Sequence, residues 1–143
     1  MNDTLTPLPA LGRILLALIF VLAGIAKLGA IAATSAHMAS HGIPYANDLV
    51  WGVVALELGG GLMLMAGFLT RLVALVFFFY LIALAVIFHP YWLMTGAQAH
   101  AQHTAFFEHL AIMGGMLYAV AFGAGAYSID ALVGWQPALP QRA

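Results

Sequence analysis

The stretch LVALVFFFYLIALAVIF, residues 72–88, decides the fold class of this chain. It contains no charged residue and is followed directly by His89 and Pro90. A helix needs about 20 predominantly apolar residues to cross about 30 Å of hydrocarbon, and this run with its neighbours approaches that length. Proline lacks the N–H that a helix interior requires, so Pro90 marks an end. We therefore predict a membrane-spanning helix over about 71–89.

The composition of the whole chain favours a membrane protein. Hydrophobic residues make up 64% of its 143 residues and charged residues 6%, whereas soluble domains average about 45–50% and about 25%. The mean hydropathy is +1.02. These values leave too few polar side chains to cover a water-soluble globule, so we expect a lipid bilayer around the chain.

Charge and cysteine content exclude further classes of protein. The chain has four Lys or Arg residues and a net charge of −1, which removes the electrostatic attraction that nucleic-acid binding requires, so nucleic acid is not a partner. Cysteine is absent, which excludes disulfide frameworks, thiolate metal sites and dithiol chemistry. Any redox role must therefore use a bound cofactor.

Three further apolar runs lie at about 10–30, 48–69 and 106–126. They are continuous, unlike the alternating pattern of membrane strands. We interpret the first as a span and not as a secretory signal, because no basic cluster precedes it. The chain is therefore predicted to be an all-α integral membrane four-helix bundle, two antiparallel hairpins within a single transmembrane domain over 1–143.

The basic residues predict the orientation. Four spans place both termini on one side of the membrane, and that side carries most of the basic residues: Arg13, Arg71 and Arg142. Lys27 lies toward the other side. Because cytoplasmic segments carry the excess of Lys and Arg, we expect both termini to be cytoplasmic. The longer connections, about 31–47 and 90–105, then lie on the extracytoplasmic side.

Small residues predict where the helices pack closely. The last span has one at every fourth position, at Ala111, Gly115, Ala119 and Gly123, and the second span contains Gly59–Gly61. Helices in lipid associate through such smooth faces, so we interpret both as packing seams.

Glu57 is an acidic residue at the middle of an apolar span, where an unpaired charge is costly. It lies 14 residues before Arg71, and Lys27 lies 14 residues after Arg13. At about 1.5 Å per residue, both are about 21 Å from the cytoplasmic surface. Lys27 and Glu57 can therefore form one buried ion pair between adjacent helices. His89 is about 27 Å from the same surface by the same count.

These depths suggest a polar pocket in the outer half of the bundle. Lys27, Glu57 and His89 would line it, together with Glu108 and His109 at the start of the last span. Such a pocket would suit a quinone head group or a metal ion. The structural alternative is that Lys27 and Glu57 join two helices, His89 anchors a helix end, and Glu108 stabilises a helix N-terminus.

A metal site is the weaker interpretation. His100, His103, Glu108 and His109 offer the imidazole and carboxylate ligands that zinc, iron or copper accept without cysteine. Their spacing is not specific for a metal site, so we assign no metal ligand.

Several short stretches of the chain together form a specific pattern: Gly12-Arg13-Ile14-Leu15, Ala23-Gly24-Ile25-Ala26-Lys27-Leu28, Glu57-Leu58-Gly59-Gly60-Gly61, Gly67-Phe68-Leu69-Thr70-Arg71, Phe88-His89, Gly114-Gly115 and Gly123-Ala124-Gly125-Ala126-Tyr127-Ser128-Ile129-Asp130. With these stretches the chain resembles the DoxX family of small four-helix bacterial inner-membrane proteins over nearly its full length. The resemblance implies a multi-pass bacterial inner-membrane location. The family includes proteins related to the DoxD subunit of thiosulfate:quinone oxidoreductase, which implies quinone-dependent redox chemistry.

The family's recurring basic, acidic and histidine positions correspond to Arg13, Lys27, Glu57, Arg71 and His89. One stretch departs from the family pattern. Similar proteins commonly open the last helix with a basic residue and an amide before Leu, where this chain has Glu108-His109-Leu110. The polarity of the outer pocket is therefore expected to differ from that of its relatives.

Together these features predict a membrane subunit of a quinone-linked oxidoreductase or redox-stress complex. Lys27, Glu57 and His89 are the predicted catalytic residues, and Glu108 and His109 join them in binding the cofactor, for which a quinone is the candidate. The chain is short, so we expect a soluble or membrane redox partner. Two alternatives are a non-enzymatic scaffold that anchors a partner protein, and a permease, which four short helices could form only as a homo-oligomer.

Overall fold

The computed structural model describes residues 7–135 and contains helices but no strand within that range. Four helical segments are long and apolar enough to cross a membrane, which confirms the predicted all-α membrane fold. The elements are α1 (Leu8–Leu28), α2 (Ile31–Ser40), α3 (Ala46–Val54), the π-helical turn η2 (Ala55–Gly60), α4 (Gly61–Ala66), α5 (Thr70–Phe88), the 3-10 turn η3 (Tyr91–Leu93), α6 (Gly96–Phe122) and α7 (Ile129–Leu132).

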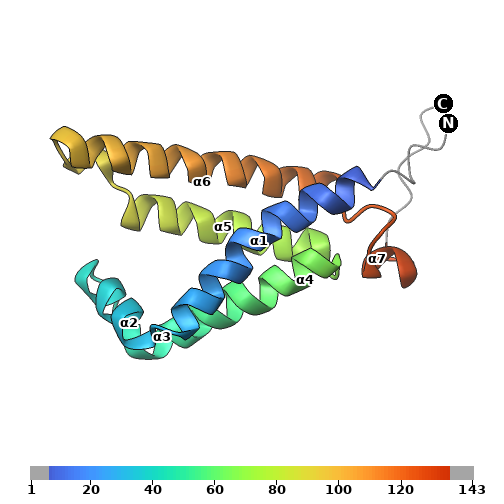
Figure 1. The fold of residues 1–143 in the computed structure, drawn as a ribbon, viewed down its shortest axis with the longest axis horizontal. Helices are drawn as coiled ribbons and strands as arrows, with labels where there is room; N and C mark the ends of the chain where they lie inside the picture. The colour runs from blue at the N-terminus through green and yellow to red at the C-terminus, as the bar shows by residue number, and fades with distance from the viewer. Residues whose placement is uncertain (1–6, 136–143) are drawn as a thin grey trace.

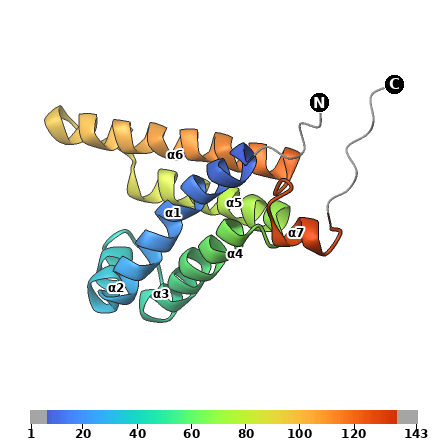
Figure 2. The same cartoon turned by 45° about the vertical axis from the view of Figure 1, so that its right-hand side comes forward.

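The spans form two hairpins. The first joins α1 to the continuous helix made of α3, η2 and α4, and the second joins α5 to α6. Figures 1 and 2 show the hairpins meeting near α7 and diverging toward α2 and η3. We call these the closed end and the open end of the bundle. The first helix begins and the last span ends at the closed end, as four spans require.

The fourth span differs most from its predicted range. It begins at Gly96, well before the apolar run that starts near 106, and it ends at Phe122. Residues 97–105 are polar but rich in Ala and Gln, which favour helix as strongly as apolar residues do. Gly123 ends the helix with φ +76°. The predicted connection at 31–47 likewise contains a helix, α2.

A buried aromatic pair joins the two hairpins. Phe20 of α1 and Phe77 of α5 stack with ring centroids 3.9 Å apart and an angle of 19° between the rings. Their neighbours form one apolar core: Ala17, Leu64, Val73, Ala74, Leu81, Met113 and Met116. Most other large apolar side chains are exposed on the outside of the helices, as expected where lipid surrounds them.

Glycines allow α1 to approach its neighbours. A Cβ atom at Gly24 would lie 2.8 Å from the Leu58 backbone nitrogen, and one at Gly61 would lie 2.9 Å from Val21. Such contacts are too short for a larger residue. On α6, a Cβ at Gly115 would meet Leu16 at 2.7 Å, so the predicted seams do pack at these positions.

Arg13 lies buried at the closed end, with 6% of its surface exposed. The depth count from the sequence treats Arg13 as a residue at the cytoplasmic surface, but its side chain does not extend toward that surface. The guanidinium turns inward and donates hydrogen bonds to the backbone carbonyls of Met65, Ala124 and Tyr127. It thereby connects the end of α4 to the segment that follows α6.

Asp130 completes this contact from the chain's last described helix. Its carboxylate accepts hydrogen bonds from the backbone N–H groups of Leu69 at 2.8 Å and Thr70 at 2.9 Å, at the start of α5. Its own N–H donates to the Gly67 carbonyl at 2.9 Å. Gly67 has φ +71°, and a Cβ there would collide with Arg13 and Ser128. The motif segments around Arg13, Gly67 and Asp130 therefore form one structural unit, which we call the clasp.

We predict that Asp130→Ala destabilises the protein. The substitution leaves the buried Thr70 N–H and the partly buried Leu69 N–H without their acceptor, and an unsatisfied buried group costs about 1–3 kcal/mol. Chemical denaturation in mild detergent would measure the loss. Asp48→Ala is the matched control, because Asp48 is an exposed carboxylate in the first turn of α3. Equal unfolding free energies for the two variants would contradict the role assigned to the clasp.

Candidate functional site

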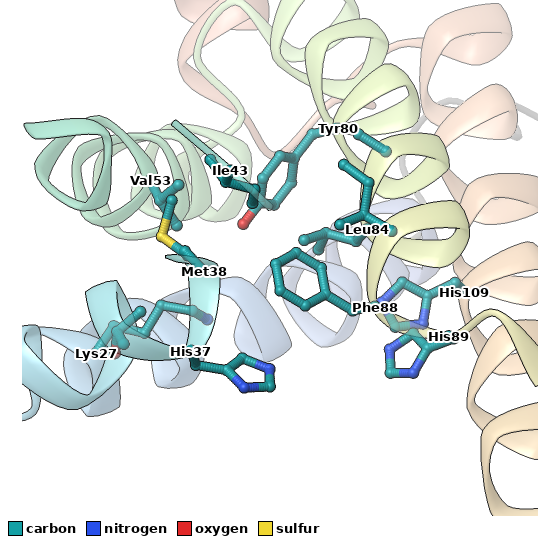
Figure 3. Close-up of a pocket in the computed structure, with 13 residues that line it drawn as sticks. Lys27, His37, Met38, Ile43, Val53, Tyr80, Leu84, Phe88, His89 and His109 are labelled. Carbon is teal, nitrogen blue, oxygen red and sulfur yellow. The ribbon is translucent and has the colours of Figure 1, made fainter. Parts of the chain in front are cut away.

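A cavity of about 370 Å³ lies between the hairpins at the open end. Figure 3 shows side chains from both hairpins and from α2 around it. Its lining residues are Lys27, Thr34, His37, Met38, Ile43, Val53, Tyr80, Ala83, Leu84, Ile87, Phe88, His89 and His109. Most are apolar with a few polar groups, and the volume falls within the range of about 300–1,000 Å³ typical of small-molecule sites.

The expected ion pair is present beside this cavity. Lys27 Nζ lies 2.7 Å from Glu57 Oε2 and 3.0 Å from Glu57 Oε1. Glu57 is 2% exposed, whereas the Lys27 side chain is 29% exposed. The carboxylate is therefore enclosed by protein, and the ammonium group lies between it and the cavity.

Tyr80 of α5 joins the pair from the second hairpin. Its hydroxyl donates a hydrogen bond to Glu57 Oε1 at 2.6 Å. Charge-assisted hydrogen bonds of this kind are stronger than neutral ones. One buried carboxylate thus binds two side chains from α1 and α5 that both line the cavity. We call Lys27, Glu57 and Tyr80 the carboxylate network.

Glu57 lies in η2, where the helix widens into a π-helical turn. Such turns are uncommon and occur frequently at functional sites. Gly24 of α1 packs directly against the same turn at Leu58. This close approach brings the backbone of α1 near enough for Lys27, one turn further along, to reach Glu57.

Two histidines lie together on the wall formed by α5 and α6. The rings of His89 and His109 have centroids 4.8 Å apart. His89 Nδ1 lies 2.6 Å from Gln102 Oε1, and His109 Nδ1 lies 2.8 Å from the Ala105 carbonyl oxygen. Both rings therefore have one nitrogen bonded to protein and the other available.

The helix α2 closes the opposite side of the cavity. His37 contributes its ring to the lining and stacks near Phe88 of α5, with centroids 5.3 Å apart. His41, one turn later, also contacts Phe88 at 4.8 Å. These ring contacts connect α2 to the second hairpin across the open end.

The structure brings most of the predicted site residues together. Lys27, His89 and His109 line the cavity, and Glu57 lies behind Lys27. Glu108 differs from the prediction, because its side chain is exposed on α6 and does not line the cavity. The helical course of α6 gives the reason: adjacent residues point about 100° apart, so His109 can face inward only if Glu108 faces away.

The other histidines do not form a metal centre with these residues. His100 is exposed, and His103 packs between the rings of Tyr91 at 4.9 Å and Phe107 at 4.7 Å. Within residues 7–135, no group of three or more His, Asp or Glu side chains is arranged to bind a metal ion.

Tyr80, His37 and Gln102 are polar residues at or near the cavity that the apolar pattern did not predict. Tyr80 could have been found, because it is the single hydrogen-bonding side chain in the run 72–88. His37 faces the cavity only because α2 folds back toward α5, and Gln102 approaches His89 only because α6 begins early. The pattern of apolar residues predicts neither the position of α2 nor the early start of α6.

We predict that the two charges depend on each other for stability. Removing one partner of a buried pair costs about 3–5 kcal/mol, whereas replacing both by apolar residues of similar volume is often close to neutral. Lys27→Met, which leaves Glu57 buried without its counter-charge, should therefore destabilise more than the double variant Lys27→Met, Glu57→Met. Denaturation of the single and double variants in detergent measures this. A double variant that loses the sum of the two single losses in unfolding free energy would show that the side chains are not coupled.

Comparisons with known proteins agree with this fold. The chain matches the family described as DoxX over residues 8–90. It is 34% identical over 120 residues to the inner membrane protein YphA of Escherichia coli, covering 84% of this chain and 86% of YphA. It is 36% identical over 121 residues to the inner membrane protein YqjF of the same organism, covering 85% and 88%. No solved structure matches the chain. With its four membrane-spanning helices, the chain is therefore a multi-pass inner-membrane protein that belongs to the DoxX family.

Proposed function

We propose that the cavity binds the head group of a quinone and that the protein is a membrane subunit of a quinone-linked oxidoreductase or redox-stress complex. One observation carries this proposal. Lys27 and Tyr80 line an otherwise largely apolar cavity in the membrane-spanning region, and one buried carboxylate binds both. Ionisable groups inside a membrane usually mark functional sites.

The lining fits a quinone ring in shape and in the placement of its polar groups. A quinone head group is a flat, uncharged ring with an oxygen atom at each of two opposite positions, so it needs apolar walls and a polar group at each end. Leu84, Ile87 and Phe88 supply apolar wall, Lys27 and Tyr80 lie at one part of the lining, and His89 and His109 lie at another. The ion pair is neutral as a whole, which favours an uncharged ligand over an anion.

Each polar residue has a role that follows from its contacts. The Lys27 ammonium group has three N–H donors, so it can donate to a ligand oxygen while it remains bonded to Glu57. Glu57 positions the Lys27 ammonium group and orients the Tyr80 hydroxyl. His89 and His109 can accept or release protons near the open end. A bound quinone would supply two-electron, two-proton chemistry, and because the chain lacks cysteine, a partner protein would exchange the electrons.

We predict that quinone co-purifies with the wild-type protein. Native mass spectrometry of protein extracted in mild detergent should show a quinone-sized adduct, and Glu57→Gln should lose it because the amide no longer pairs with Lys27. Glu108→Gln is the matched control, since that exposed side chain lies outside the cavity, and it should retain the adduct.

An unliganded mass for the wild-type protein, even after incubation with a short-chain quinone, would contradict the proposal. The ion pair of Lys27 and Glu57, which joins α1 to η2, would then support the alternative function of a membrane scaffold for a partner protein.

A further inference from the structure

We propose that this cavity distinguishes the two redox states of its ligand and binds the dihydroxy form, the quinol, more tightly than the dione. This inference rests on the proposed function. It follows from the hydrogen-bonding state of the two histidines in the wall and of the carboxylate network.

The tautomer of His109 follows from its partner. Its Nδ1 lies 2.8 Å from the Ala105 backbone carbonyl oxygen. A carbonyl oxygen can only accept a hydrogen bond, so Nδ1 carries the proton and donates it. In a neutral imidazole the other nitrogen is then an acceptor. Nε2 of His109 therefore presents a lone pair.

His89 is in the same state for a related reason. Its Nδ1 lies 2.6 Å from Gln102 Oε1, an amide oxygen that accepts. The proton of neutral His89 is therefore on Nδ1, and Nε2 again presents a lone pair. The two rings are neighbours, with centroids 4.8 Å apart, and both line the cavity. This part of the wall accepts hydrogen bonds and donates none from these rings.

A quinol hydroxyl matches such a wall, whereas a dione carbonyl does not. The quinol hydroxyl donates a hydrogen bond to the Nε2 lone pair of a histidine ring. A dione carbonyl has only lone pairs, so it would lose its hydrogen bonds to water without gaining a donor from these residues, which is unfavourable for a buried polar group.

The carboxylate network accommodates the other end of a quinol. The Tyr80 hydroxyl donates its proton to Glu57, which leaves the phenolic oxygen as an acceptor, while Lys27 retains a donor. A hydroxyl is both donor and acceptor, so it can bond to Tyr80 and Lys27 together. A dione oxygen can accept from Lys27 alone. The quinol is therefore satisfied at both ends and the dione at one.

The test compares the affinities of the two redox states. We would measure dissociation constants for a short-chain benzoquinol and for the benzoquinone with the same tail, without oxygen, on protein in lipid nanodiscs, with empty nanodiscs as the blank. The quinol should bind about tenfold more tightly, which corresponds to about 1.4 kcal/mol and lies near the upper end of what one neutral hydrogen bond contributes.

The variant His109→Phe retains a flat ring but removes the acceptor. It should weaken quinol binding more than quinone binding, so that the affinity ratio falls toward one. His100→Phe, on the exposed part of the same helix, is the matched control and should keep the wild-type ratio. A merely structural role for His109 would weaken both ligands equally and leave the ratio unchanged.

Gln102 is a positioning residue, because it acts on the ligand through His89. Its substitution provides a second, independent test of the affinity ratio. Gln102→Leu removes the acceptor that holds the His89 proton on Nδ1 and should lower the ratio, whereas Gln98→Leu, at an exposed position one turn earlier on α6, should leave the ratio unchanged. This pair keeps the test decisive if His109→Phe fails to fold.

Each result has a distinct meaning. Equal binding of both redox states by the wild-type protein, or a ratio unchanged in His109→Phe and Gln102→Leu, would overturn this inference while leaving quinone binding intact. Failure of both redox states to bind would contradict the proposed function itself.

Discussion

The structure depends on one constraint, which is that a carboxylate inside the membrane must be paired. Glu57 is 2% exposed, and an unpaired charge at that depth would cost several kcal/mol. Lys27 of α1 and Tyr80 of α5 satisfy it from two different hairpins. The same contacts that stabilise the carboxylate therefore join the hairpins and fix two polar groups beside the cavity.

The two ends of the bundle differ in how closely the hairpins are joined. At the closed end, Arg13 and Asp130 bond to backbone groups of the turn between α4 and α5 and of the segment after α6. These contacts bind the hairpins together where they converge (Figure 1). At the open end the hairpins diverge, and α2 covers the space between them through ring contacts with Phe88. A ligand cavity can exist there because the clasp stabilises the opposite end.

The sequence predicted the spans and the depth of the ion pair because both depend on distance along a helix. Counting residues from Arg13 and Arg71 placed Lys27 and Glu57 at one level, and the structure shows them in contact. The sequence did not predict the features that depend on how distant segments pack together. Apolar runs show where lipid surrounds a helix but not where the helix ends, so α2 and the polar start of α6 were missed. Arg13 was placed at the interface because its backbone carbonyl partners, including that of Ala124, are far away in the sequence.

The most direct test of this account is an infrared difference spectrum of the wild-type protein minus Glu57→Gln in lipid, with Glu108→Gln as the exposed control. The account requires Glu57 to be an ionised carboxylate bonded to Lys27. The difference spectrum should then contain the paired stretching bands of a carboxylate and no carbonyl band of a protonated acid. A protonated-acid band lost with Glu57 would contradict the account, because a neutral Glu57 would leave Lys27 without its counter-charge.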